Sequence, residues 1–500
     1  MLPLAPGHRP RRSLPARAAL VLALCLGFAT PGPGPALAEE PPDEGDCPTV
    51  SVSPEEQKQG LDAVPIAIKE GMILDQEALL VLRRLLPAEI WRHREVFFFE
   101  GMRMQIGYCH RRYLDAPFYR DATQRFRGQA KLDGDGNLTN YTAGVPFPAD
   151  SIDSDAKDAG LRWAWNMQMR YRGAGHRGKF RFVDLASGLG GDLSFEGKFF
   201  FLQTRHRADL PDDDYTVEDS ESMVFASGGV FDKPFDARHL AWRQFRSLAA
   251  NTDYEEPDDV FVYVPTMRKT RRSATNWLDG VFFPRYSASG DAGGGGIAMG
   301  SQLGGGFSAI NPTAGQSIAA SEDSGKGWTG LAIRPNAYVW RVREVRDVLA
   351  PINATRPGWP QEDERNFGTS GLSFASDTWD VRRAVVLEGL LKERGRDVKS
   401  IVVYLDYLTR TPMYWITRTS KRRHLEVGIL VHRYSADIDK YPDWPGGHPS
   451  NVLEPVAASF FNAISGTGGW RRESYDMVSL PFDKDSRRRM TSSDHLGRGH

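Results

Sequence analysis

The chain has 500 residues, with 63 basic and 64 acidic side chains and a formal net charge of −1. This balance argues against nucleic acid as the main partner, because nucleic-acid-binding chains usually carry a surplus of basic residues. The length is sufficient for one large domain or for two of ordinary size.

Residues 1–38 have the pattern of a cleaved secretory signal. Four arginines precede or open the apolar run Ala18–Ala29, and Ala36-Leu37-Ala38 gives the small-x-small cleavage pattern. The apolar run is shorter than the roughly 20 residues that a membrane-spanning helix needs. We therefore predict export to the periplasm with cleavage after Ala38, the alternative being an uncleaved anchor. The mature chain would hold 59 basic and 64 acidic residues, a net charge of −5, and no later apolar run suggests a membrane span.

Cys47 and Cys109 are the cysteines that remain after the signal. An exported protein enters an oxidising compartment, where a disulfide between them can form. Two free thiols are the alternative. A structural zinc site is not expected, since two cysteines without a histidine pair at metal spacing cannot complete it.

Residues 39–94 precede the main domain. The first part, to about residue 55, is rich in proline and acidic residues and is expected to be loose. A helical pattern follows over 53–94, because Leu79, Leu82, Leu86 and Ile90 recur at intervals of three and four. Pro87 suits the first turn of a new helix.

From residue 95 to the C-terminus, which we treat as one domain, the pattern is that of strands. Many segments are rich in β-branched and aromatic residues and are separated by Gly, Asp and Asn. Such a chain predicts a mainly β (α+β) fold with a large, curved antiparallel sheet. The predicted strands lie within 95–108, 125–141, 161–173, 178–188, 193–206, 258–265, 337–345, 380–389 and 400–417.

The segment 161–171 shows the strongest alternation. Trp163, Trp165, Met167 and Met169 fall on one face of the predicted strand, together with other apolar residues, and polar residues fall on the opposite face. A sheet of this size must cover its apolar face by closing into a barrel, by packing helices or by binding a ligand. Large, soft side chains suit an irregular cavity and also an ordinary core, so both interpretations remain.

Residues 287–327 are rich in Gly, Ser and Ala and have almost no periodicity. A segment of this length and composition is either a disordered insertion or a functional loop such as a lid.

No catalytic motif, metal site or cofactor motif emerges. The chain lacks a phosphate-binding loop, a nucleophile elbow and a zinc-protease motif. Asp133–Asn137 has the start of a calcium loop, but Leu138 replaces its required glycine, so a hairpin turn is predicted. Asp212–Asp214 is interpreted as solvated surface. His424 and His432 share a face of a strand-like segment, with no third ligand in view.

The strand at Asp258–Val264 is followed by a cationic segment. Phe261 and Tyr263 lie on one face of this strand, and valines lie on the other. The cations can contact a ligand's phosphate or carboxylate at a cavity mouth. They can equally pair with the protein's own acidic residues, for which Asp258, Asp259 and Asp279 are the candidates. The cations are Arg268, Lys269, Arg271 and Arg272.

Four segments together resemble the exported bacterial proteins of the domain of unknown function 1329 family. They occur in the same order in this chain: Pro87–Trp91, Ala143–Pro148, Trp163–Asn166 and Val262–Arg272. That family is in turn similar to the LolA-like periplasmic carriers of lipoproteins. The resemblance implies an incomplete antiparallel β-barrel, plugged by helices around an apolar cavity.

Lipoprotein-sorting relatives carry a strand similar to the one that ends at Arg272. The matching residues are Tyr263, Pro265, Met267, Arg268, Arg271 and Arg272. The chain departs from these relatives directly afterwards, at Asn276–Phe283, so lipoprotein handling is not carried over to it. Members are often encoded beside exporters of the resistance–nodulation–division type, which suggests a lipid transport pathway.

The favoured hypothesis is a periplasmic carrier or chaperone that holds a lipid-like amphipathic ligand, without catalysis. Possible partners are an inner-membrane exporter and an outer-membrane protein, and the alternative hypothesis is a non-catalytic accessory subunit of such an exporter. An enzyme acting on a lipid-like substrate would require convergent carboxylates or a Ser-His pair in a cavity. The predicted ligand-binding residues are Trp163, Trp165, Met167, Met169, Phe261, Tyr263, Arg268, Arg271 and Arg272.

Overall fold

The computed structural model describes most of the chain after the predicted signal. The described residues are 42–51, 65–78, 83–185, 193–210, 215–273, 281–283, 326–327, 332–354, 365–393, 398–463 and 470–496. The chain divides between Ala36 and Leu37, and all described residues belong to the second part. The predicted signal, Asp212–Asp214, Asp279 and all of the glycine-rich insertion except 326–327 lie outside the described residues.

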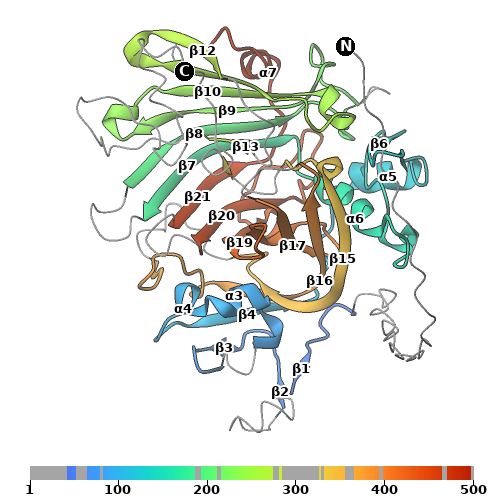
Figure 1. Ribbon diagram of the computed structural model, residues 1–500, viewed down its shortest axis with the longest axis vertical. Helices are drawn as coiled ribbons and strands as arrows, with labels where there is room; N and C mark the ends of the chain where they lie inside the picture. Colours follow the sequence, from blue (N-terminus) through green and yellow to red (C-terminus); the bar gives the residue numbers. More distant parts are fainter. Residues whose placement is uncertain are drawn as a thin grey trace, which may run out of the picture. The chain divides into compact units, whose positions relative to one another are not determined.

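One 15-stranded sheet dominates the described structure (Figure 1). Its strand order is β12-β11-β10-β9-β8-β7-β21-β20-β19-β18-β17-β16-β4-β3, and β15 also pairs with β16. The strands are β3 (Ile73–Leu74), β4 (Met104–Cys109), β7 (Gly175–Leu185), β8 (Leu193–Gln203), β9 (Met223–Lys233), β10 (Ala241–Ser247), β11 (Asp259–Val264), β12 (Lys269–Ser273), β15 (Tyr338–Ala350), β16 (Thr378–Leu391), β17 (Ser400–Asp406), β18 (Pro412–Arg418), β19 (His424–Tyr434), β20 (Leu453–Asn462) and β21 (Trp470–Val478).

The mainly β, antiparallel prediction is confirmed. Neighbouring strands of the sheet pair antiparallel, with the exception among the described strands of the parallel pair β16 and β4. Within the described residues the sheet does not close on itself, since β12 lies at one end and β3 and β15 lie at the other. The expected incomplete barrel with a helical plug is therefore not confirmed.

Alternating side chains explain why these segments form strands. In β11, Val260, Val262 and Val264 are buried and the residues between them are partly exposed, which is the pattern of a strand with one covered face. Strands β7, β8, β11, β15, β16, β17 and β18 fall in predicted segments, whereas β9, β10, β20 and β21 were not predicted. The hairpin at Asp133–Asn137 is confirmed, because β5 (Lys131–Leu132) pairs with β6 (Leu138–Thr139).

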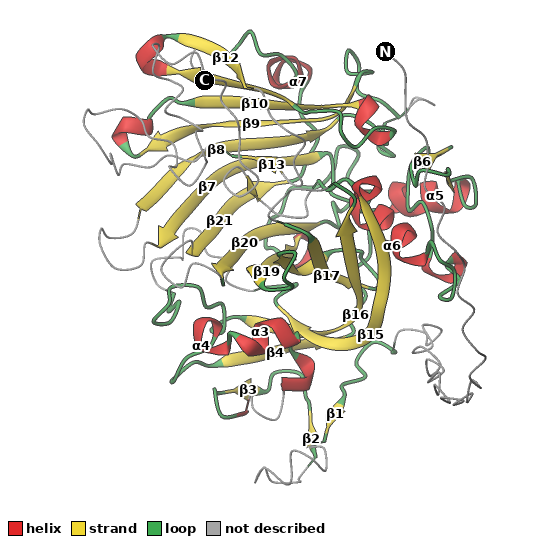
Figure 2. Ribbon diagram, viewed as in Figure 1, coloured by secondary structure: helices red, strands yellow, loops and turns green. Residues whose placement is uncertain are grey.

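The strand predicted at 161–171 is wrong, because this segment forms helix α6 (Ala159–Gln168). The helix is buried on two sides, so its apolar residues satisfy a period of two as well as a helical period. Trp163 and Met167 are four residues apart and pack toward β15 and β16. Figure 2 shows α6 beside these two strands. Trp165 and Met169 are also four residues apart and pack on the other side, beside Phe147.

The N-terminal segment contains short strands as well as helices. Helix α3 (Ala88–Arg92) begins directly after Pro87, as predicted, and α4 (Arg94–Phe97) follows. The continuous helical pattern expected over 53–94 is wrong, because β2 (Ile66–Ala67) pairs with β1 (Thr49–Val50) and β3 joins the main sheet. Glu95–Phe97, which was expected to begin a strand, lies in α4.

Two further helices are α5 (Pro117–Arg125) and α7 (Lys484–Met490), and a separate strand pair joins β13 (Val281–Phe282) to β14 (Lys326–Gly327). Among the described helices, none is long and apolar enough to cross a membrane.

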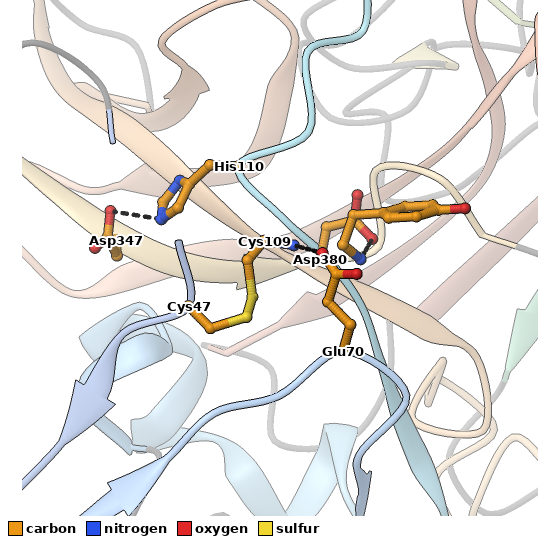
Figure 3. Close-up of a disulfide and its surroundings, with 7 residues drawn as sticks. Cys47, Glu70, Cys109, His110, Asp347 and Asp380 are labelled. Atoms are coloured by element: carbon orange, nitrogen blue, oxygen red, sulfur yellow. Dashed lines mark hydrogen bonds and ion pairs between the residues drawn. A yellow bond between two sulfur atoms is a disulfide. The ribbon is translucent and has the colours of Figure 1, made fainter. Parts of the chain in front are cut away.

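A disulfide between Cys47 and Cys109 ties the N-terminal segment to β4 (Figure 3). The two Cα atoms are 5.2 Å apart, and 62 residues separate the two positions in the sequence. The backbone amide of Cys109 donates to Glu70 Oε1 (3.0 Å), and its carbonyl oxygen accepts from Gly45 N (2.9 Å). Of the two alternatives for these cysteines, the structure has the bonded one.

Candidate functional site

The structure does not gather the predicted ligand-binding residues into one site. Trp163 and Met167 belong to a core cluster between α6 and strands β15–β18, and Trp165 and Met169 belong to a second, smaller cluster. All four side chains are buried. Their position supports the interpretation as core for Trp163, Trp165 and Met167, while Met169 also reaches a pocket that is described below.

Phe261 and Tyr263 lie on the partly exposed face of β11, opposite its buried valines. Phe261 contacts Phe245 of the neighbouring strand, with the ring centroids 5.9 Å apart. These two aromatic residues therefore face away from the large apolar cluster that the valines join.

The cations after β11 lie at the end of the sheet. Arg268 and Arg272 are exposed and Arg271 is partly exposed. Arg272 pairs with Asp259, so one of the expected internal ion pairs is present. This pair is on the surface, where an ion pair contributes about 1 kcal/mol or less to stability.

Asp258 pairs with different arginines from those expected. Arg246 donates two hydrogen bonds to it, Nε to Oδ1 (3.0 Å) and Nη2 to Oδ2 (2.9 Å), and Arg334 donates to Oδ1 (2.7 Å). All three side chains are buried. Burial raises the pKa of Asp258, but the two guanidinium groups outweigh burial, so its pKa lies below the ordinary value.

The most distinctive apolar feature is a set of stacked rings on one face of the sheet, which we call the aromatic layer. Its residues alternate with outward-facing ones along their strands, and all are buried. Adjacent rings have centroids 4.7–6.5 Å apart, mostly in tilted or edge-to-face arrangements. The aromatic layer consists of Phe180 and Phe182 of β7, Phe199 of β8, Phe231 of β9, Trp242 of β10, Tyr475 of β21, and Phe283, which follows β13.

Glycines in the strands make room for these rings. A Cβ atom on Gly197 would lie 2.9 Å from the ring of Phe180, and one on Gly229 would lie 2.6 Å from the indole of Trp242. Both distances are too short for a side chain, so the rings lie directly on the backbone of the neighbouring strand.

Phe283 joins the aromatic layer from outside the main sheet. Its ring centroid lies 4.7 Å from that of Phe182, 5.1 Å from that of Trp242 and 5.3 Å from that of Phe180. It is held by the short pair β13–β14 and not by a long strand or helix. A side chain in this position occupies volume that an apolar ligand would need on the same face.

Buried charges border the aromatic layer. Gln244 and Arg246 continue the face of Trp242 along β10, because they follow it at intervals of two. Arg246 lies over the ring of Phe225 (4.8 Å to the centroid) and reaches the Asp258 carboxylate. The face therefore changes from aromatic to charged along this strand.

A buried Ser-His pair is present, but a substrate cannot reach it. His176 Nδ1 lies 2.6 Å from Ser479 Oγ, and the Ser479 hydroxyl donates to Glu454 Oε1 (2.8 Å). All three side chains are fully buried. The serine proton is directed to the carboxylate, so the imidazole does not activate the hydroxyl in the way that a nucleophilic serine requires. Burial also raises the pKa of Glu454 above its ordinary value.

No metal centre appears in the described part of the chain, where no three His, Cys, Asp or Glu side chains gather closely enough to hold an ion. His424 and His432 both lie in β19, as the sequence suggested. His424 Nδ1 lies 3.2 Å from His93 Nε2, and His432 is buried elsewhere along the strand.

Solved structures that match this chain do so with low sequence identity and low structural similarity scores. They include an outer membrane lipoprotein-sorting protein domain from Vibrio parahaemolyticus, at 12% identity and a TM-score of 0.38, with 69% of this chain and 100% of that chain covered. A DUF1329 family protein from Desulfovibrio piger has 12% identity and a TM-score of 0.37, with 69% and 97% covered. A LolA superfamily protein from Nitrosomonas europaea has 11% identity and a TM-score of 0.31, with 67% and 97% covered.

The comparison with curated proteins gave no match. Residues 95–286 match the model of the family described as "Protein of unknown function (DUF1329)", and this segment contains three of the four motifs on which the resemblance was based. The resemblance of this chain to the DUF1329 family is thus confirmed over residues 95–286.

Proposed function

We propose that the protein is a non-catalytic periplasmic carrier or chaperone, and that it binds a lipid-like amphipathic ligand on the aromatic layer. The observation that carries this proposal is the set of stacked rings across β7–β10 and β21, which Phe283 covers from a short, separate strand pair. A long strand or helix packed over the rings would cover this face more stably than the short pair β13–β14 does.

The driving force would be burial of an acyl chain against these rings. Burial of apolar surface contributes about 25 cal/mol per Å². Two polar groups lie within the layer, the Tyr475 hydroxyl, which donates to Glu473, and the buried indole N–H of Trp242. The acyl chain would take the place of Phe283. The charged border at Arg246 and Asp258 would limit how far the chain extends along β10.

Release would require that the acyl chain leave the rings and Phe283 return to them. A carrier of this kind passes its ligand to a partner, for which an inner-membrane exporter and an outer-membrane protein are the proposed candidates. The cations at the end of β11, Arg268 and Arg271, would be available to a partner or a ligand head group.

Titration with a fluorescent palmitate analogue tests the proposal. Phe283→Ala removes the covering ring, so we expect the variant to bind the probe at least about tenfold more tightly than the parent chain, as one ring's burial corresponds to several kcal/mol. Phe245→Ala, on the opposite face, is the matched control and should leave probe binding unchanged. If neither the parent nor folded Phe283→Ala binds the probe, the ligand-carrier proposal fails and the accessory-subunit hypothesis gains support.

A further inference from the structure

A pocket of about 480 Å³ lies between the β5–β6 hairpin, the end of α6 and the turn after β10. Its volume falls within the range of roughly 300–1,000 Å³ that is typical of small-molecule sites. The residues that line it include Tyr141, Met169, Arg205, His206, Leu248 and Ala249.

One part of the pocket is apolar and aromatic. The rings of Tyr141 and His206 stack with their centroids 4.6 Å apart and their planes 40° apart. Met169, at the end of α6, and Leu248 add flexible apolar surface. Together these residues suit a flat, apolar group.

Arg205 is the single cation among the lining residues, and no carboxylate lines the pocket. Its Nη1 donates to the carbonyl oxygen of Glu221 (2.7 Å), and its Nε is buried without a hydrogen-bond partner. Within the described residues, no acidic side chain pairs with this guanidinium. Among the residues that the structure describes, the positive charge at the pocket thus has no acidic partner, and an anionic group would complement it.

His206 provides a neutral acceptor beside this cation. Its Nδ1 lies 2.8 Å from the carbonyl oxygen of Thr142, so Nδ1 carries the proton and Nε2 is left with its lone pair. Burial, together with the nearby charge of Arg205, lowers the pKa of His206 to about 4, although the bond to Thr142 opposes the shift. The imidazole is therefore uncharged at neutral pH.

We propose that this pocket binds a small organic anion with a flat apolar body, of the aromatic carboxylate class, with the carboxylate at Arg205 and the apolar body against Tyr141, Met169 and Leu248. Asn140, Asn251 and Thr252 supply neutral polar groups at the same pocket. The inference does not rest on the lipid-carrier proposal, since none of the rings of the aromatic layer lines this pocket.

Calorimetric titration with naphthoate and with its uncharged analogue naphthamide tests this inference, because the two probes share one apolar body. We expect naphthoate to bind the full mature chain at one site, and naphthamide to bind at least about tenfold more weakly, since a charge-assisted hydrogen bond is lost. Arg205→Gln should remove the preference for naphthoate, and Arg205→Lys should restore part of it. Arg238→Gln, at an exposed arginine away from the pocket, is the control.

Two further readouts keep the test decisive. Ala249→Trp should fill the pocket and abolish naphthoate binding while the chain remains folded by circular dichroism. In the parent chain, binding of naphthoate should raise the pKa of His206 in an NMR titration. Equal binding of the two probes, no binding of either, or unchanged naphthoate binding by Arg205→Gln would overturn the inference. Arg205→Gln should leave binding of the palmitate probe unchanged, so failure here and failure of the carrier proposal are distinguishable.

Discussion

The indole of Trp242 lies directly on the backbone of Gly229, because a Cβ atom at position 229 would be 2.6 Å from the ring. These residues are paired across β9 and β10, and the indole is fully buried. A side chain at position 229 would collide with the indole, so the packing of the aromatic layer depends on glycine at this position.

Gly229→Ala should destabilise the protein by about 1–3 kcal/mol, the cost of overpacking in a core. The same Cβ would lie 2.4 Å from the carbonyl oxygen of Lys198, which is backbone and cannot move aside easily. Chemical denaturation measures the loss. Gly134→Ala is the control, because nothing lies within 4 Å of its Cβ position and the free energy of unfolding should barely change. Equal stability of Gly229→Ala and the parent would contradict the packing described for Trp242.

Removal of the Asp258 carboxylate should have a large, pH-dependent cost. Asp258→Asn leaves Arg246 and Arg334 buried without their counter-ion, and loss of one partner of a buried ion pair costs about 3–5 kcal/mol. The folded pKa of Asp258 is lower than its ordinary value of 3.8, so its contribution is complete above that value and is lost as pH falls through the folded pKa.

Denaturation of the parent and of Asp258→Asn across this range gives the comparison. The difference in free energy of unfolding between the parent and Asp258→Asn should be constant from neutral pH down to the ordinary carboxyl pKa. It should shrink at lower pH. Asp259→Asn, which breaks the exposed pair with Arg272, should cost about 1 kcal/mol or less. Similar effects of the two variants would show that Asp258 does not hold a buried charge cluster.

His432 should make the folded state sensitive to acid. Burial, assisted by the charge of Arg170, lowers its pKa from 6.5 to about 3, and its Nδ1 is buried without a hydrogen-bond partner. The unfolded chain binds a proton at this residue as pH falls below 6.5, and the folded chain does not. The free energy of unfolding therefore keeps its full value above pH 6.5. As the pH falls from 6.5 toward the folded pKa of about 3, it decreases by up to about 1.4 kcal/mol per pH unit.

His432→Gln should reduce the slope of stability against pH over this interval, measured by denaturation at a series of pH values. His448→Gln, at an exposed histidine, should leave the slope as it is in the parent. An unchanged slope in His432→Gln would mean that His432 becomes protonated inside the folded protein.

The disulfide should contribute substantially to stability. A cross-link that closes a loop of 62 residues is worth about 4 kcal/mol by its effect on the unfolded chain. The double variant Cys47→Ser, Cys109→Ser should lose stability of that order and should no longer respond to a reductant, whereas the parent should be destabilised when reduced. A parent that melts at the same temperature with and without reductant would contradict this role.

Much of the sheet could be predicted from the sequence, and α6 shows why part of it could not. Segments rich in β-branched and aromatic residues identified β7, β8 and β11. In α6 an alternation of apolar residues arises because Trp163 and Trp165 pack on opposite sides of a helix that is buried on both. The middle of strand β9, from Ala226 to Gly229, has little strand propensity, and Gly229 pairs there with Trp242 of the next strand.

Most of the candidate site could not be predicted from the sequence, for a related reason. Phe180, Phe182 and Phe199 alternate within predicted strands, a signal that could have identified the aromatic layer, but Phe283 joins them only through the tertiary fold. The buried partners of Asp258 are 12 and 76 residues away in the sequence. The pocket at Arg205 is built from residues of separate hairpins and turns, and no local motif marks it.

Native mass spectrometry of the protein, purified from the cells that produce it and then extracted with organic solvent, shows whether a lipid-like ligand is bound. We expect a stoichiometric adduct that is extracted as a lipid and that is retained by the Arg205→Gln variant. A clean mass without adduct, unchanged after the protein is exposed to lipid vesicles, would contradict the proposal that the aromatic layer carries a lipid-like ligand.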